Sequence, residues 1–527
     1  MGTDARIHLP DDLPHCHEII RQQLETLGSA TRRVEQLERQ LDQLLRARYG
    51  RSSEKVDEAQ LRLFAQDILD QQAEAVQASA LPPDTEEEES QHNPKRKKRG
   101  RRSLPENLER RPCVHDVSPH ELACPDCGQE RTRFGEEVSE QLEYVPSSLY
   151  VVEHIRPKYA CKACQGHVII ADKPNQPIEK GLPGPGLLAQ VVVSKYGDHL
   201  PLYRLERIFK RSGLEISRST TCGWMGCMAE LLSPLYGLMV PLVLESKVVH
   251  TDDTPVRVQE KGLGKTRQGR VWVYVGDNDH PYTVFDYTRT HSRDGPATFL
   301  HSFSGFLQAD AYRGYDAIYT GLATTGTVFE VACWAHTRRK FFGARLSDAE
   351  CAHRAMAYIG QLYGVEKRAK ALDGDGRCAL RQAESRPILE QFKRWLDEQS
   401  DRVLPKSPLG DAMSYTLSNW AALNRYTEDG DLAIDNNPAE NALRGLCLGR
   451  KNWLFFGSDN GGKTAAVLFS LIASCQRNDL DPYEYLRDVI VRISDHPLSQ
   501  LEDLLPDRWK AARSEAEAEA TPSPVST

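Results

Sequence analysis

The chain has 527 residues, of which 40% are hydrophobic and 27% charged, and its formal net charge is −8. This composition is ordinary for a globular protein, and the length predicts about three domains. The acidic balance excludes a uniformly basic, histone-like protein, although local clusters of cations can still bind nucleic acid. We find neither an apolar run that approaches the roughly 18 residues of a membrane helix nor a secretory signal. The cysteine count of 13 is odd and favours a reducing compartment, so we expect a cytoplasmic protein without a membrane partner.

Residues 1–70 are predicted to form a long helix. Apolar residues recur there with heptad spacing, in two rows three residues apart: Ile20, Leu27, Val34 and Leu41, with Ala30, Leu37 and Leu44. An apolar seam of this period is typical of a coiled coil, and we expect the chain to self-associate through it. The alternative is an amphipathic helix that packs on its own domain.

Residues 71–111 have the composition of a disordered linker. Consecutive glutamates at 86–89 precede a basic run, which is formed by Lys95, Arg96, Lys97, Lys98, Arg99, Arg101 and Arg102. Such a cluster can neutralise DNA phosphates and release their counterions, which predicts a DNA-binding arm. A charge run that is merely solvated is the alternative.

Residues 112–175 contain two Cys-x-x-Cys pairs, Cys124 with Cys127 and Cys161 with Cys164. Each pair can direct two thiolates at one tetrahedral Zn²⁺. We therefore predict a zinc ribbon-like module, although the gap between the pairs is longer than usual for a ribbon. A redox-active pair and free buried cysteines are the alternatives.

Residues 184–244 show helical patterns. One helix is expected from Leu187, a second over residues 201–211, and a third after a cap at Ser217 or Ser219. Two helices joined by a short glycine turn, with several arginines beside it, have the shape of a helix-turn-helix DNA-binding unit. A plain helical connector explains the same pattern.

Residues 245–465 change to a strand pattern. Short apolar segments are predicted as strands at 247–250, 270–275, 282–287, 306–310 and 327–333. A mostly helical stretch follows at about 335–430, so we predict a multidomain α/β protein whose core carries a large helical insertion. Residues 466–505 are predicted as a helical C-terminal segment, and residues 506–527 as a disordered tail.

Three acidic residues are candidate metal ligands. Asp252 and Asp310 stand at the ends of predicted strands, and Glu440 stands near the start of a predicted helix. Carboxylates in such positions can converge on two divalent cations, and Mg²⁺ prefers oxygen ligands while leaving positions open for phosphate. Such a site can drive in-line displacement at phosphorus without a nucleophilic side chain. Among 75 acidic residues, this choice of three is a weak signal by itself.

Residues 457–464 match the phosphate-binding pattern G-x-x-x-x-G-K-[ST]. A nucleotide-binding fold of that type needs several further parallel strands and an acid at a strand end. The short remainder of the chain after Thr464 has a helical pattern instead. ATP binding is therefore a minor alternative.

Several motifs together resemble the insertion sequence 66 family of DDE transposases. They are YGRSSEK at 49–55, the paired Cys-x-x-Cys, LLAQVVVSKYGDHLPLYR at 187–204, HTDDTP at 250–255, LQADAYRGY at 307–315, CWAHTRRKF at 333–341, DNNPAE at 435–440 and RKNWLF at 450–455. The resemblance runs from about residue 37 to residue 486. It implies a leucine-zipper-like N-terminus, a zinc-binding module, a helix-turn-helix-like region and an RNase-H-like catalytic core with a helical insertion.

The resemblance also implies a function, that of a bacterial DNA transposase that uses Mg²⁺ (or Mn²⁺) and holds Zn²⁺. Such an enzyme binds the terminal inverted repeats of its element, nicks the element ends and joins the freed 3′-hydroxyl to target DNA. Its partners would be both kinds of DNA, further copies of the chain and small accessory proteins encoded by the element. It would lie in the cytoplasm, at the nucleoid when bound to DNA. The alternatives are a catalytically inactive, transposase-derived DNA-binding protein and a P-loop ATPase that acts on DNA.

Carried over residue by residue, the resemblance puts the catalytic, metal-binding acids at Asp252, Asp310 and Glu440. The family has Asp-Glu-Thr-Pro at the first acid, whereas this chain has Asp253 in place of the glutamate. Successive strand residues face opposite ways, so only one of these neighbours can face the metals, and we choose Asp252. The family usually has Arg after the third acid, and Asn441 in that place can remove a phosphate contact.

Basic residues near these acids are predicted to line a DNA channel: Arg338, Arg339, Arg450 and Lys451. A solvated helix face is the alternative for them. Trp334 and Trp453 are either core residues or platforms for splayed bases. His336 is either a contact to the scissile phosphate or a satisfied, partly buried histidine.

Overall fold

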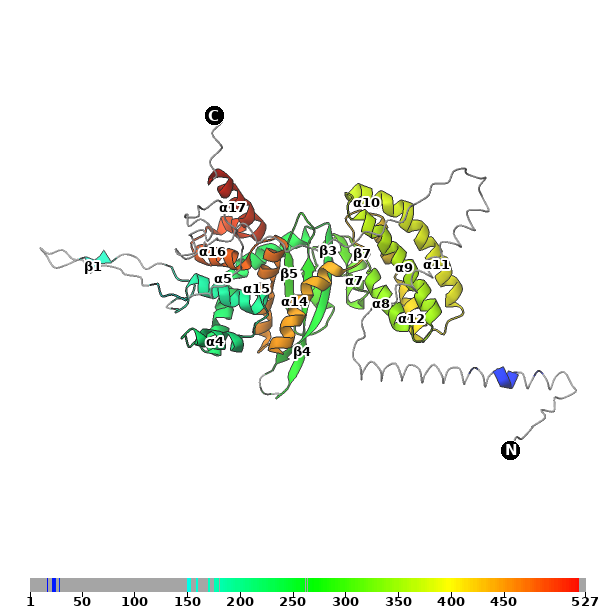
Figure 1. The fold of residues 1–527 in the computed structure, drawn as a ribbon, viewed down its shortest axis with the longest axis horizontal. Coiled ribbons are helices and arrows are strands. Elements are labelled where there is room, and N and C mark those ends of the chain that lie inside the picture. Colours follow the sequence, from blue (N-terminus) through cyan, green and yellow to red (C-terminus); the bar gives the residue numbers. More distant parts are fainter. Residues whose placement is uncertain are drawn as a thin grey trace, which may run out of the picture. The chain divides into compact units, whose positions relative to one another are not determined.

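The computed structural model describes residues 17, 21–24, 28, 149–152, 158–159, 169–170, 175–179, 181–260, 262 and 264–520. Figure 1 shows their helices and strands, coloured along the chain. The chain divides into two compact units, of which one is Ser79–Ala171 and the other is Met1–Ala78 with Asp172–Thr527. The predicted heptad seam, the basic run and the four predicted zinc ligands lie outside the described residues. Residues 17, 21–24 and 28 are helical, as predicted for their segment.

The smaller unit contributes one described pair of strands. Strand β1 (Lys158–Tyr159) pairs antiparallel with β2 (Ile169–Ile170), and Lys158 is opposite Ile170. The pair joins the chain on either side of the second Cys-x-x-Cys of the sequence.

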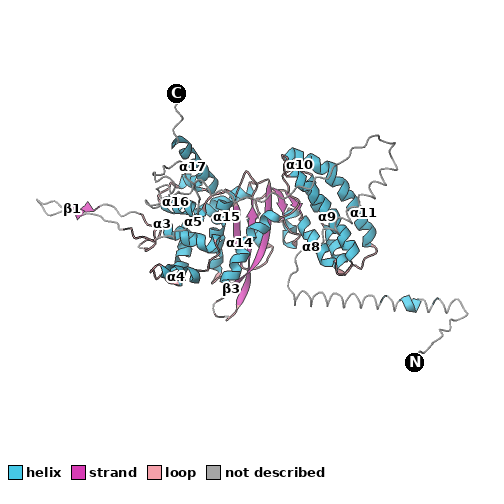
Figure 2. Ribbon diagram, in the orientation of Figure 1, coloured by secondary structure: helices cyan, strands magenta, loops and turns pink. Residues whose placement is uncertain are grey.

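The larger unit is built on one five-stranded mixed sheet with the order β5-β4-β3-β6-β7, whose strands are drawn as arrows in Figure 2. Antiparallel neighbours are β3 (Val248–Gln259), β4 (Thr266–Val275) and β5 (Thr283–Thr288). Strands β6 (Gly305–Gln308) and β7 (Val328–Val331) run parallel to β3. The predicted strands are confirmed, because runs rich in β-branched and aromatic residues form them. Strand β3 is longer than predicted, so Asp252 lies within it and not at its end.

Helix α15 (Asp459–Arg477) covers the free edge of β5. The Ser474 hydroxyl accepts a hydrogen bond from Thr283 N at 3.0 Å, and the Ser470 hydroxyl accepts one from Phe285 N at 2.8 Å. Side-chain oxygens thus satisfy backbone donors that an edge strand leaves open. The boundary predicted between residues 465 and 466 falls inside this helix, so the core and the C-terminal segment share one element.

The region 184–244 forms the predicted helices. They are α3 (Pro185–Val192), continued by a π-helical turn to Gly197, α4 (Leu202–Arg211) and α5 (Arg218–Leu244). Gly213 has a φ of 79° in the turn after α4, and Ser217 caps α5 by accepting from Thr220 N at 3.1 Å. Buried residues of α5 such as Met228 belong to the same hydrophobic core as the sheet. These helices are therefore packed into the core and do not stand apart from it.

Helix α5 is long and apolar enough to cross a membrane by length and composition alone. This finding corrects the expectation that the chain has no such run. The buried side chains of α5 pack into the core, and Tyr236 OH donates to Phe285 O of β5 at 3.0 Å. These contacts make α5 part of the core, and 33% of its most apolar 18-residue window is buried.

The predicted helical insertion is present between β7 and α14 (Asn437–Trp453). Its helices are α8 (Trp334–Ala344), α9 (Ala349–Ala369), α10 (Gly374–Leu380), α11 (Arg386–Ser400), α12 (Pro408–Ser418) and α13 (Trp420–Asn424). They enclose a second hydrophobic core around Phe392. Two short helices, α6 (Asp294–Phe299) and α7 (Asp316–Tyr319), lie in the connections between strands.

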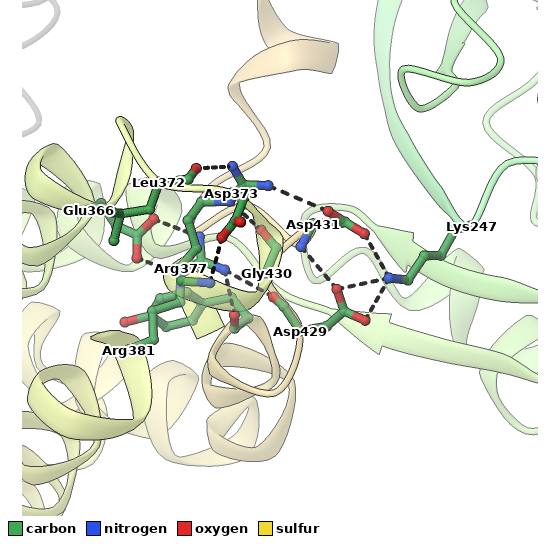
Figure 3. A network of polar contacts seen from close by, with 11 residues as sticks. Lys247, Glu366, Leu372, Asp373, Arg377, Arg381, Asp429, Gly430 and Asp431 are labelled. Atoms are coloured by element: carbon green, nitrogen blue, oxygen red, sulfur yellow. Dashed lines mark hydrogen bonds and ion pairs between the residues drawn. The ribbon is translucent and has the colours of Figure 1, made fainter. Parts of the chain in front are cut away.

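Figure 3 shows the polar network that fastens the end of the insertion to the sheet. The Arg381 side chain is 3% exposed and binds both Glu366 oxygens, at 2.8 and 2.7 Å. It also donates to Asp429 O at 2.9 Å. Lys247, just before β3, binds the carboxylates of Asp429 and Asp431 at 2.8 and 2.7 Å. The segment that leads into the DNNPAE motif is thus held both by the insertion and by the sheet.

The C-terminal part contains α16 (Pro482–Arg492) and α17 (Pro506–Ala520). The sequence predicted disorder for residues 506–527, and the structure corrects this for residues 506–520, which form α17. Trp509 is 7% exposed, and its indole N–H donates to Asp488 of α16 at 2.8 Å. One buried aromatic residue therefore anchors a helix whose later part is rich in Ala and Glu.

Candidate active site

Asp252 and Asp253 have different partners, because they are successive residues of one strand. The Asp253 side chain is 12% exposed and binds Arg270 Nη1 at 2.6 Å and His291 Nε2 at 3.2 Å. Asp252 accepts a hydrogen bond from Asp253 N at 2.8 Å. Its carboxyl group lies within the electrostatic reach of the other two predicted acids. Asp253 is therefore an ion-paired residue, whereas Asp252 faces further acids.

Strand register relates Asp252 to Asp310. Strands β3 and β6 are parallel, and His250 is opposite Gln308. Each acid follows its paired residue by two positions, so both acids lie at the level where β6 ends. Ala309 N donates to Val331 O of β7 at 3.2 Å, which fixes the chain just before Asp310.

Asn436 fixes the start of α14, the helix that carries Glu440 in its first turn. Its buried amide donates to Thr251 O at 2.8 Å and contacts His250 Nδ1 at 3.2 Å. Its backbone N–H donates to Cys333 Sγ at 3.2 Å. One residue thus ties α14 to β3 and to the end of β7. Sequence reasoning did not single out Asn436, and its signal is a pair of asparagines just before a helix-starting proline.

Helix α8 presents His336 and Arg339 to Glu440. His336 Nδ1 lies 3.6 Å from Glu440 Oε1, and Arg339 Nη2 lies 3.5 Å from Glu440 Oε2. Within the described part of the chain, His336 Nδ1 and Glu440 Oε1 are buried atoms without a hydrogen-bond partner. Cys333 Sγ completes a group whose ligand atoms lie within 4.8 Å of one another. Burial raises the pKa of Cys333 to about 11, so this thiol remains protonated and acts as an acceptor for Asn436.

Burial and mutual repulsion perturb the predicted acids. Burial, together with the charges of Asp310, Asp253 and Glu440, raises the pKa of Asp252 to about 7, while the hydrogen bond from Asp253 N opposes this shift. Burial also raises the pKa of Asp310, while the charge of His336 opposes this. Carboxyl groups that repel one another in a partly buried place gain most from a cation with a preference for oxygen ligands. The donor set, with a buried Glu440 oxygen that accepts no hydrogen bond from the described residues, therefore suits a divalent cation.

The predicted DNA-channel residues fall into different environments. Arg450 turns inward, where its guanidinium donates to Thr254 Oγ1 at 2.9 Å and to Pro255 O. It fastens α14 to β3, whereas Lys451 is exposed. Trp334 is fully buried and donates to a backbone carbonyl of α13 at 2.8 Å. The core alternative is therefore confirmed for Trp334.

Three further predicted residues lie on α8 and at the end of α14. Arg338 and Trp453 are half-buried, and Arg339 is exposed. The Trp453 ring stacks on Phe456 with the ring centroids 4.7 Å apart. Of these side chains, Arg339 reaches the candidate site through its contact with Glu440.

The structure of residues 457–464 differs from a nucleotide-binding loop. Helix α15 begins at Asp459, and Ser458 caps it by accepting a backbone N–H of the first turn at 3.2 Å. Tyr287 OH donates to Asp459 at 2.6 Å, so a carboxylate stands at the helix N-terminus where a phosphate would bind. Gly462 is a packing requirement, because a Cβ there would lie 2.6 Å from the Tyr287 ring. The motif match thus has a structural explanation.

Fold and site together define a mixed α/β protein in which Asp310 and Glu440 lie within electrostatic range of Asp252, beside the end of a parallel strand. Four family models match the chain: "Transposase IS66 family" at residues 180–464, "zinc-finger binding domain of transposase IS66" at 121–165, "IS66 C-terminal element" at 470–506 and "Transposase C of IS166 homeodomain" at 36–112. The chain belongs to the IS66 transposase family. These domains support a DNA-binding transposase and suggest a divalent metal and zinc.

The chain is also similar to proteins of Sinorhizobium fredii. It is 32% identical over 440 residues to the uncharacterized protein y4hP, covering 79% of this chain and 78% of that protein. It is 35% identical over 429 residues to the uncharacterized protein y4qI, covering 79% of each. Their names assign no activity, so the transposase assignment rests on the family.

Proposed function

We propose that this chain is the enzyme that cuts and joins DNA at the ends of its mobile element. Asp252, Asp310 and Glu440 would hold two divalent cations, Mg²⁺ or Mn²⁺. When bound, such cations activate a water or a DNA 3′-hydroxyl and stabilise the leaving oxygen at phosphorus. The observation that carries the proposal is that the half-buried carboxyl group of Asp252 on β3 feels the charges of Asp310, after β6, and of Glu440, in the first turn of α14.

An RNase-H-like core is the fold that we propose for the catalytic part. The support is the sheet itself, in which three antiparallel strands are followed in the chain by two strands parallel to the first. A long helix, α14, then brings the third acid back to the sheet. The insertion between β7 and α14 explains the large sequence separation between the second and third acids.

The neighbours of the acids would have positioning roles. Arg270 and His291 keep Asp253 paired, which leaves Asp252 as the proposed ligand on β3. Arg339 contacts Glu440 from α8 and would hold this carboxylate in place before the metals bind. Each of these groups supports the geometry without taking part in bond breaking.

The N-terminal modules would recognise and pair the element ends. Cys124, Cys127, Cys161 and Cys164 are the proposed ligands of one Zn²⁺, supported by the zinc-finger match at residues 121–165. The basic run at 95–102 would contact phosphates, and the N-terminal helix would join copies of the chain in the bacterial cytoplasm. Accessory proteins of the element would assist there.

The test uses the full-length protein and linear DNA that carries both element ends. Wild-type protein with Mg²⁺ should nick at the ends, and Asp310→Asn should lower the rate by at least about 1,000-fold, as expected when a transition-state contact is lost. Asp316→Asn, which changes an exposed carboxylate nearby, should retain the activity. Cleavage by Asp310→Asn at the wild-type rate would overturn the proposal. Binding without any cleavage by the wild type would instead favour the catalytically inactive DNA-binding protein.

A further inference from the structure

Helix α14 ends in a strained turn that exposes two large apolar side chains. Leu454 has a φ of 69° and a ψ of −43°, and Phe455 N donates to Trp453 O at 2.9 Å. These values define the rarer, strained form of the γ-turn, and a positive φ is exceptional for a bulky residue such as leucine. Leu454 is 62% exposed and Phe455 is 42% exposed. We name this pair the apolar tip.

The backbone on both sides of the apolar tip is held firmly. Leu454 N donates to Arg450 O at 2.9 Å, which completes the last turn of α14. Phe456 then joins the edge of the sheet, since its N–H donates to Arg257 O and its carbonyl accepts from Gln259 N, both at 2.8 Å. The strained conformation is therefore imposed by two anchors, and strain that is kept in this way marks a functional constraint.

The surroundings of the apolar tip are positively charged. Lys451 and Lys463 are exposed three and eight residues from the tip along the chain, and the exposed Arg257 lies on β3, where its carbonyl accepts from Phe456 N. The carboxylates of Glu260 and Asp459 are paired, because Arg267 binds both and Arg289 contacts them as well. Lys463 acts on a third carboxyl group, that of Asp286. Five basic side chains thus accompany three acidic ones. A surface that combines rigid apolar side chains with surplus cations is complementary to a polyanion with an apolar interior.

We propose that the apolar tip is a wedge that enters duplex DNA between adjacent base pairs, while the surrounding cations hold the flanking phosphates. The idea rests on the proposed function, because the DNA is the transposase's own substrate. Glu440 and the tip stand at opposite ends of α14, about 20 Å apart at 1.5 Å per residue. The base-pair step that the tip unstacks should therefore lie within about six base pairs of the DNA phosphate that binds at the three acids. Unstacking there would let the duplex bend towards the candidate active site.

The experiment compares two fluorescent duplexes of one sequence, one fully paired and one with a two-nucleotide mismatch bubble. Affinities are measured by fluorescence anisotropy with the full-length protein in EDTA, so that no cleavage is needed. Inserting the tip between base pairs costs unstacking energy, and this cost is smaller where the bases are already unpaired. Wild-type protein should therefore bind the bubble duplex about tenfold more tightly than the paired duplex. The double variant Leu454→Ala/Phe455→Ala should reduce this preference to less than about twofold. The control Leu498→Ala changes an apolar residue that is 85% exposed elsewhere, and it should retain the preference.

A second variant separates the wedge from effects on folding. Glycine adopts a positive φ without steric cost, so Leu454→Gly should melt at or above the wild-type temperature while it loses several-fold of the bubble preference. The wedge is wrong if the wild type shows no preference or if the double variant keeps it. It is also wrong if the double variant binds both duplexes normally but no longer self-associates, since the tip would then contact protein. An Asp310→Asn protein that still cleaves DNA, with the preference intact, would refute the proposed function and leave the wedge standing.

Discussion

Replacing Asp252 by asparagine is expected to stabilise the metal-free protein at pH 8. Burial raises the pKa of Asp252 to about 7, so the folded state binds this proton more tightly than the unfolded state, whose pKa is about 4. The stabilising effect of the proton is fully present below about pH 4 and is lost as the pH rises to about 7. An amide carries no charge, and its oxygen can still accept the hydrogen bond from Asp253 N. The variant therefore avoids the free-energy cost of a buried negative charge, which destabilises the wild type at pH 8.

The size of the effect follows from the two pKa values. A step from about 4 to about 7 corresponds to roughly 4 kcal/mol, because each pKa unit is worth 1.36 kcal/mol. Solvent reaches the half-buried carboxyl group and screens the repulsion, so we expect about 2 kcal/mol. For a folded region of this size, such a gain raises the melting temperature by about 3 °C.

The assay is thermal unfolding in EDTA at pH 5 and pH 8, followed by intrinsic fluorescence. Asp252→Asn should exceed the wild type by about 3 °C at pH 8 and by clearly less at pH 5. Added Mn²⁺ should raise the wild-type melting temperature more than that of the variant. The matched control is Asp253→Asn, which breaks the contact with Arg270 at 2.6 Å and should melt below the wild type at pH 8. The predicted destabilisation by Asp252 is refuted if Asp252→Asn and Asp253→Asn raise the melting temperature equally at pH 8, or if Asp252→Asn melts below the wild type there. Either result would mean that the charged Asp252 carboxylate does not destabilise the metal-free fold.

Three further predictions concern other parts of the chain. Arg381→Met should lower the free energy of unfolding by about 3 kcal/mol in urea titrations, because Glu366 is left mostly buried without its partner. The double variant Arg381→Met/Glu366→Gln should regain part of this stability, and no recovery would contradict the ion-pair explanation. ATP should leave the melting temperature unchanged for the wild type and for Lys463→Ala, and a shift that is present only in the wild type would revive the nucleotide-binding alternative. Metal analysis should find about one zinc per chain and markedly less after Cys127→Ser, and less than about half an equivalent in the wild type would count against the zinc module.

Much of the sheet could be predicted from the sequence, because each strand is a short run of apolar residues between turn formers. The helix cap at Ser217 could be predicted as well, since a serine before a helical pattern is a local signal. The strand order required pairing between distant segments, and no local pattern encodes it. The position of Asp252 within β3 was missed for the same reason, because the second half of β3 is defined by its long pairing with β4.

Other differences arise where a single long-range contact decides the outcome. Composition predicted disorder for the C-terminal tail, yet one indole, that of Trp509, finds Asp488 and the core. A phosphate-binding motif was matched at 457–464, yet its Gly462 serves a close approach to Tyr287. In both cases the local sequence pattern is present, and a contact with a distant residue determines which structure it forms.

The helical insertion has a consequence for the candidate site, because it lies between the second and the third acid in the chain. Glu440 can lie beside the sheet only if the segment after the insertion is held in one position, and several contacts hold it there. Lys247 binds the returning segment from the β3 side, and Tyr363 of α9 donates to Asp435 at 3.0 Å. Gly430 packs so closely that a Cβ would lie 1.8 Å from Gly374 O, so no larger residue fits there. The folding of the insertion is therefore coupled to the position of the third carboxylate, and a destabilised insertion should impair catalysis without touching an acid.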